Sequence, residues 1–130
     1  MVLFYICNMI NLNITDEFST LRAVVLGIAD SNGLTPKLED TYDPKSAEHI
    51  KAGTYPKEQD MVQEMELVFQ ILSKYNVKVY RPEKISNYNQ IFSRDIAFVI
   101  EDKMIISNIL PDRNKEIDAI KHVWSQVDKN

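Results

Sequence analysis

The longest periodic pattern in this sequence is helical and covers residues 57–75. Pro56 suits a first helical position, and several acidic residues near the start favour the positive end of the helix dipole. Asn76 is of a type that adopts the left-handed conformation at a helix end. The apolar residues recur every three or four positions, as on one face of an α-helix; they are Met61, Val62, Met65, Val68, Phe69 and Leu72. The pattern therefore predicts one long amphipathic helix.

Short apolar runs on either side of this helix predict strands. Residues 21–28 are rich in β-branched side chains, which is typical of a buried strand. Residues 77–80 alternate as in a half-buried strand, until Pro82 ends the pattern. Between the first strand and the helix, residues 29–55 are polar and contain several glycines and prolines. A loop of that length is typical of a functional lid, or of a permissive surface excursion.

The second half of the chain predicts a hairpin and a helix. Residues 96–100 and 104–107 flank a short polar turn. After Pro111, with Asp112 as the candidate N-cap, four apolar residues share one helical face: Ile117, Ile120, Trp124 and Val127. No later strand is available to cover this face, so we expect it to be exposed. The order strand, helix, strand, hairpin, helix predicts an α/β domain (α+β modules).

Composition excludes several classes of protein. The 130 residues are 45% hydrophobic, which suffices for the core of one domain. A net charge of −4 argues against a nucleic-acid partner. Cys7 is the only cysteine, which fits a reducing compartment, so we expect a cytoplasmic protein. His49 and His122 lack metal-ligand spacing, and we expect neither a metal nor another cofactor.

The start of the chain is apolar but short. It lacks the basic region of a signal peptide and is too short to cross a bilayer, so we expect no membrane partner. We interpret residues 1–8 as an upstream extension, and residues 1–16 together as an N-terminal extension or an edge strand. Residues 17–130 then form the domain.

Three segments in order carry a family resemblance. Residues 17–27 look like an opening strand, and residues 64–83 like a helix followed by a strand that ends in Arg-Pro-Glu. In residues 92–107 an aromatic-x-Arg-Asp motif opens a hairpin strand, and Arg-x-x-Glu follows at 113–116. Together the segments resemble the guanidino-group-modifying enzymes of the pentein superfamily, which include arginine deiminases, dimethylarginine dimethylaminohydrolases and amidinotransferases. The resemblance implies a partial pentein fold, an α/β-propeller of ββαβ-type units, with about two of its five modules present here.

The resemblance also implies a substrate site. A guanidinium is a planar fork of N–H donors, so a carboxylate that accepts two of them both orients and neutralises it. Asp95 would bind the guanidinium of arginine or another guanidino compound, and Arg113 would approach a substrate carboxylate or brace the site. The residues alone allow simpler interpretations: Asp95 pairs with Arg94 or caps a turn, and Arg113 is a surface arginine at the start of a helix.

In such enzymes a cysteine attacks the guanidino carbon to form a covalent intermediate, which water or an amine then resolves. The expected Glu-Gly-Gly-Asp motif, catalytic histidine and C-terminal cysteine are missing from this sequence, and Cys7 lies at the wrong end. We therefore predict no catalytic residue here and an N-terminal portion that is inactive alone, with further C-terminal modules or a homo-oligomer as its complement. The alternative is a small ferredoxin-like module for ligand sensing or assembly, without catalysis.

Overall fold

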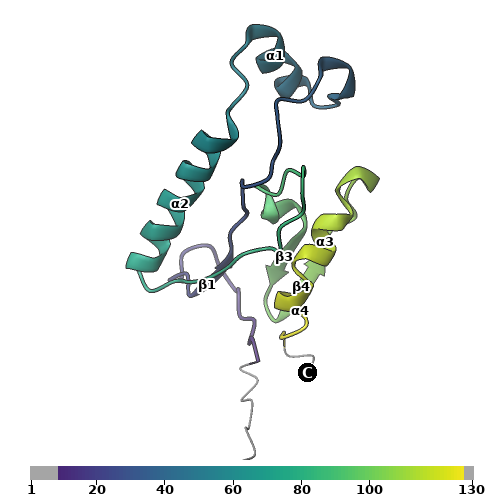
Figure 1. Cartoon of the computed structure of the whole chain (residues 1–130). Helices are drawn as coiled ribbons and strands as arrows, with labels where there is room; N and C mark the ends of the chain where they lie inside the picture. Colours follow the sequence, from purple (N-terminus) through teal and green to yellow (C-terminus); the bar gives the residue numbers. More distant parts are fainter. Residues whose placement is uncertain (1–8, 128–130) are drawn as a thin grey trace, which may run out of the picture.

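The computed structural model describes residues 9–127, which form two small sheets with helices around them (Figure 1). The predicted extension at residues 1–8, with Cys7, lies outside the described residues. Ile10 and Ile14 contact the rest of the domain through isolated β-bridges to Val127 and Glu101. The mixture of helix and strand agrees with the predicted α/β class. No helix in residues 9–127 is long and apolar enough to cross a membrane.

The first sheet pairs two strands that are far apart in the sequence. Strand β1 (Ala23–Val25) lies parallel to β2 (Lys78–Tyr80). The predicted long helix is confirmed as α2 (Glu58–Lys74), and Asn76 after it has a φ of 57°, as predicted. The start of α2 is attached to the segment that follows β1, because the Glu58 carboxylate accepts hydrogen bonds from the backbone N–H groups of Ser31 and Gly33, at 3.2 and 2.7 Å.

The segment after β1 turns away from β2. Ile28 N–H donates to the Gln90 carbonyl at 3.1 Å. The backbone at Gly27 therefore lies close to the backbone of residues 90 and 91. A Cβ at Gly27 would lie 2.1 Å from the Ile91 carbonyl oxygen. The predicted strand at 21–28 is therefore confirmed only at residues 23–25, because beyond Leu26 the backbone pairs with Gln90 and no longer with β2.

The predicted polar loop at 29–55 contains helical structure that we did not predict. The short 3-10 turn η1 (Leu38–Asp40) precedes helix α1 (Pro44–Ala52). The side chain of Asp43 caps this helix by accepting from Ser46 N–H at 2.7 Å, and Gly53 ends it with a φ of 68°. Asp-Pro before the helix and glycine after it were usable signals. Figure 1 shows α1 at one end of the molecule, away from both sheets.

The predicted hairpin is confirmed. Strands β3 (Ala97–Ile100) and β4 (Lys103–Ile106) are antiparallel, with Val99 opposite Met104. The 3-10 turn η2 (Ser93–Asp95) leads into β3. Because the described strands form two separate sheets, the arrangement differs from the single sheet of a ferredoxin-like module.

The prediction of a single C-terminal helix is wrong. The 3-10 turn η3 (Pro111–Arg113) is followed by two short helices, α3 (Lys115–Ala119) and α4 (Lys121–Trp124). The break releases the Ala119 carbonyl, which accepts from Glu83 N–H at 2.7 Å. Asp112 makes no capping bond, so its predicted N-cap role is also wrong.

The two short helices contribute several residues to the buried core. The predicted exposed face is wrong for Ile120, which is fully buried, whereas Ile117, Trp124 and Val127 are half-buried. The buried apolar residues are Ile28, Ala29, Val77, Ile96, Ala119, Ile120 and Val123. Buried Gln90 is satisfied, since its amide donates to the Glu83 carbonyl at 2.8 Å and accepts from Ile85 N–H at 2.7 Å.

Candidate functional site

A guanidinium held by two carboxylates lies between the hairpin and the C-terminal helices. Arg113 donates through Nε and Nη2 to the two oxygens of Glu116, at 2.6 and 3.0 Å. Its Nη1 donates to Oδ2 of Asp95 at 2.9 Å. The side chain of Glu116 is completely buried, that of Arg113 is 19% exposed, and that of Asp95 is 41% exposed. The three residues therefore form a cluster that is buried at one end and open at the other.

Local structure positions Asp95 at the open end. It closes the turn η2, where its backbone N–H donates to the Phe92 carbonyl at 3.0 Å. Ser93 attaches the same turn to the first sheet, because its hydroxyl donates to the Val25 carbonyl at 3.0 Å. Ile96, directly after Asp95, is buried in the core. These contacts fix the backbone of Asp95 while its carboxylate stays at the surface.

Charge in the cluster is unevenly compensated. The hydrogen bonds that Arg113 donates to Glu116, with a further contribution from the one to Asp95, raise the pKa of the Arg113 guanidinium above its usual range, although burial opposes the shift. Glu116 thus shares a full ion pair with Arg113. The second oxygen of Asp95, Oδ1, lies 3.6 Å from Nε of Arg94, whose side chain is 88% exposed. Such a surface pair contributes little, so Oδ1 of Asp95 remains available for another partner.

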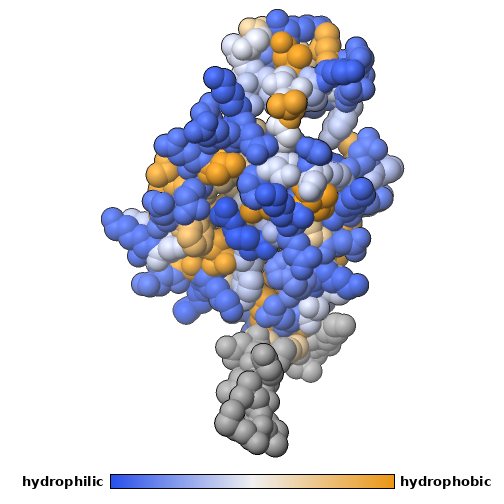
Figure 2. Space-filling model, in the orientation of Figure 1, coloured by the Kyte–Doolittle hydropathy of each residue, from blue (hydrophilic) through white to orange (hydrophobic). Residues whose placement is uncertain are grey.

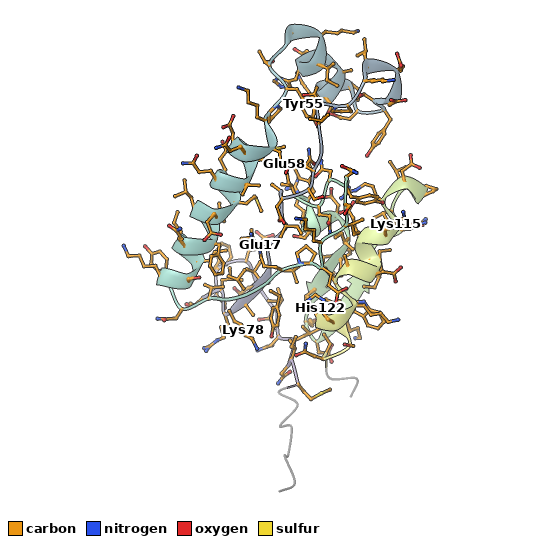
Figure 3. The ribbon with its side chains drawn as sticks, in the orientation of Figure 1. Glu17, Tyr55, Glu58, Lys78, Lys115 and His122 are labelled. Carbon is orange, nitrogen blue, oxygen red and sulfur yellow. The ribbon has the colours of Figure 1, made fainter. Side chains whose placement is uncertain are left out.

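Asp95 opens into a polar cavity of about 440 Å³. Five carboxylates and one guanidinium are among its lining groups, which leaves a formal charge of −4 in the cavity. The charged residues are Asp40, Asp43, Asp95, Asp112, Glu116 and Arg113, and the aromatic ones are Tyr42, Tyr55, Tyr88 and Phe92. One wall comes from the segment around α1 and the other from η2 and η3. Figure 3 labels Tyr55 below α1 and Lys115 at the start of α3, on either side of this region.

Tyr88 stiffens the second wall of the cavity. Its hydroxyl donates a hydrogen bond to the backbone carbonyl of Asp112. Partial burial, followed by the nearby charge of Glu116, raises the pKa of the Tyr88 phenol. The phenol is therefore neutral near pH 7 and offers the cavity a ring face and no charge.

A second, larger cavity lies between the two sheets. It has a volume of about 660 Å³ and is lined almost entirely by apolar side chains, among them Leu26, Val99 and Met104. It lacks the convergent charged groups of the smaller cavity, so the chemistry of the molecule is concentrated around Asp95. Within residues 9–127, no three His, Cys, Asp or Glu side chains are arranged so that they could hold a metal ion.

The structure brings together the two residues that the sequence singled out. Asp95 and Arg113 are in direct contact, and Asp95 also faces Arg94, the partner in the simpler interpretation. Arg113 is not a plain surface arginine, because most of its side chain is covered. Sequence reasoning missed Glu116 as part of the site, although its position three residues after Arg113 on a helix was a usable signal. The tyrosines gave no signal, since only tertiary structure gathers them.

A scan of the chain against models of known protein families finds no match, and a search of curated proteins finds none that is similar.

Proposed function

We propose that this chain forms the guanidinium-binding part of an amidinotransferase-like or arginine-modifying enzyme of the pentein superfamily. The substrate is arginine or another guanidino compound, and Asp95 accepts its guanidinium N–H groups. Arg113 holds the carboxylate of Asp95 in place by a hydrogen bond from the buried side of the cluster. The observation that carries the proposal is the half-exposed carboxylate of Asp95 in a cavity with a formal charge of −4.

Charge supports a cationic ligand. A concave surface whose charged groups are mainly carboxylates concentrates cations, and the field is stronger where protein walls exclude water. The aromatic rings in the same cavity add attraction for a flat cation over their faces. An anionic ligand would meet repulsion from every side except that of Arg113, whose charge is already shared with Glu116.

The contacts of Arg113 support a guanidinium in particular. Its Nη1 reaches Asp95, and its Nη2 also lies 3.4 Å from the Phe92 carbonyl. A resident guanidinium therefore already uses the acceptors of this site. Asp95 keeps one oxygen for a second guanidinium, which would approach from the open side.

The proposed chemistry needs a thiolate from outside residues 9–127, which contain no cysteine. The thiolate would form an S–C bond to the guanidino carbon while a C–N bond breaks and the departing amine takes a proton. Water or an amine would then attack the same carbon, and the S–C bond would break. The amidino group would thereby be transferred to this acceptor and the thiolate released. The family resemblance assigns the thiol, the proton-transferring histidine and the remaining propeller modules to further C-terminal sequence or to a second chain. We propose a cytoplasmic location on the cysteine count alone.

The proposal is tested by binding of butylguanidinium to this chain, with butylammonium as a cation that lacks the planar fork. Calorimetry should show saturable butylguanidinium binding that weakens about tenfold or more in Asp95→Asn, since an amide cannot accept from two donors with full charge. Asp118→Asn, which removes an exposed carboxylate outside the cavity, is the matched control and should leave binding unchanged. Equal affinity of Asp95→Asn and the unmodified chain would contradict the proposal.

A second candidate function is assembly without catalysis. The observation that favours it is exposed apolar surface on α2 and on the hairpin, where Phe98 and Ile100 are about half exposed. Light scattering over a concentration series tests it. Assembly through the hairpin predicts association that Phe98→Ser abolishes, and a monomer at every concentration would contradict it.

A further inference from the structure

We infer that Glu116 is a positioning residue that keeps the resident guanidinium of Arg113 from closing the ligand site. Glu116 does so by holding Arg113 with both carboxylate oxygens, which leaves Asp95 one oxygen for an incoming guanidinium. The inference rests on the proposed guanidinium site and assigns it a residue that controls its occupancy.

The geometry of the guanidinium supports this division. An arginine head group binds a carboxylate most strongly through two parallel hydrogen bonds. Glu116 takes such a pair, on the Nε and Nη2 edge of Arg113. Asp95 receives a single hydrogen bond, from Nη1. Arg113 therefore contacts Asp95 with only one of its donors.

Burial supports the same division. Glu116 has no exposed side-chain surface, and in the described part of the chain its carboxylate accepts hydrogen bonds from Arg113. A buried carboxylate without a cation is strongly disfavoured, whereas a half-exposed one is solvated by water. The ion pair with Glu116 is thus the one that Arg113 gives up last, and Asp95 is the partner that it shares with a ligand.

A neutral side chain at position 116 would remove the preference of Arg113 for that position over Asp95. The charge of Arg113 would then be balanced only by Asp95, and the head group would turn toward it. Asp95 would be neutralised from inside the protein, and an external guanidinium would have to displace a tethered one. Glu116 thereby affects ligand affinity through Arg113, without touching the ligand.

A double-mutant cycle tests this coupling with butylguanidinium as the probe. Glu116→Gln should weaken binding about tenfold, because Arg113 then competes for Asp95. Replacing the ion pair as a whole, with Arg113→Gln and Glu116→Gln together, removes the competitor and should give affinity at least about threefold higher than that of Glu116→Gln alone. A purely structural role for Glu116 predicts instead that the double variant binds as weakly as the single one.

A second measurement needs no ligand and no change to the buried pair. In Asp95→Asn, the Nε–H resonance of Arg113 should keep its slow hydrogen exchange, since Glu116 holds that proton. Rapid exchange in this variant would show that Asp95 holds Arg113, and the inference would be wrong even if Glu116→Gln fails to fold. Absence of Asp95-dependent binding by the unmodified chain would instead refute the proposed function, so the two failures are distinguishable.

Discussion

Helix α2 spans 17 residues and buries none of them, whereas α3 and α4 span five and four residues and bury Glu116, Ala119 and Val123. The long helix α2 therefore contributes no fully buried residue to the core, whereas the short helices α3 and α4 contribute three. A regular apolar face is sufficient to predict a helix, but burial also needs neighbouring elements on several sides.

The neighbours explain the difference. Helix α2 packs on a sheet of only two strands, and apolar side chains on its outer side remain exposed, including Leu67 and Ile71. Figure 2 shows apolar surface over the part of the molecule where α2 lies. The short helices are instead bonded to distant parts of the chain, because the Ala119 carbonyl accepts from Glu83 N–H and the Gln126 carbonyl, just after α4, accepts from Ile10 N–H.

The largest expected effect comes from leaving the charge in the C-terminal helices without its partner. Arg113→Ala strips buried Glu116 of its cation and should lower the free energy of unfolding by about 3–5 kcal/mol in urea denaturation. Arg94→Ala, in the exposed neighbour of Asp95, should change it by less than about 0.5 kcal/mol. Similar losses in both variants would contradict the buried ion pair.

An apolar truncation compares the two regions directly. Ile120→Ala, between α3 and α4, should cost about 2–5 kcal/mol, because the side chain is fully buried. Ile71→Ala on α2 should cost no more than about 0.5 kcal/mol, since its side chain is 58% exposed. If Ile71→Ala costs as much as Ile120→Ala, α2 is covered in solution and the comparison fails.

Polar replacement of exposed apolar residues on α2 tests whether a second copy of the chain covers this helix. Leu67→Gln combined with Ile71→Gln should leave the free energy of unfolding within about 0.5 kcal/mol and should reduce any self-association seen by sedimentation. A melting temperature that rises with protein concentration in the unmodified chain, but not in this variant, would show that a second copy covers α2.

The smallest effect concerns α1, which has no buried residues. The capping hydrogen bond from Ser46 N–H lowers the pKa of Asp43, so this contribution is present above the usual aspartate pKa of about 4. It is lost as the pH falls through the lower pKa of the folded state. Asp43→Ala should slightly reduce helicity at pH 7 by circular dichroism, and this difference should shrink as the pH falls. A difference in helicity that stays constant from pH 7 down to acid pH would contradict the charged cap.

The local elements followed from the sequence where a pattern is short-range. Periodicity predicted α2, and alternation predicted β2. Apolar runs on either side of a polar turn predicted the hairpin, and Asn76 was predicted to end the long helix, because these features depend on neighbours along the chain. The Asp-Pro and glycine signals around α1 were present as well, but the polarity of the segment concealed a short helix in which no residue is buried.

Tertiary structure alone decided which of these elements form the core and how the site is assembled. The C-terminal pattern divides into two helices at the point where the Ala119 carbonyl accepts a hydrogen bond from Glu83 N–H, a contact between residues far apart in the sequence. The sequence singled out Asp95 and Arg113, but their contact and the burial of Glu116 depend on how η2, η3 and α3 pack. Local patterns record preferences of the backbone, whereas burial and charge pairing depend on which distant residues share one small volume.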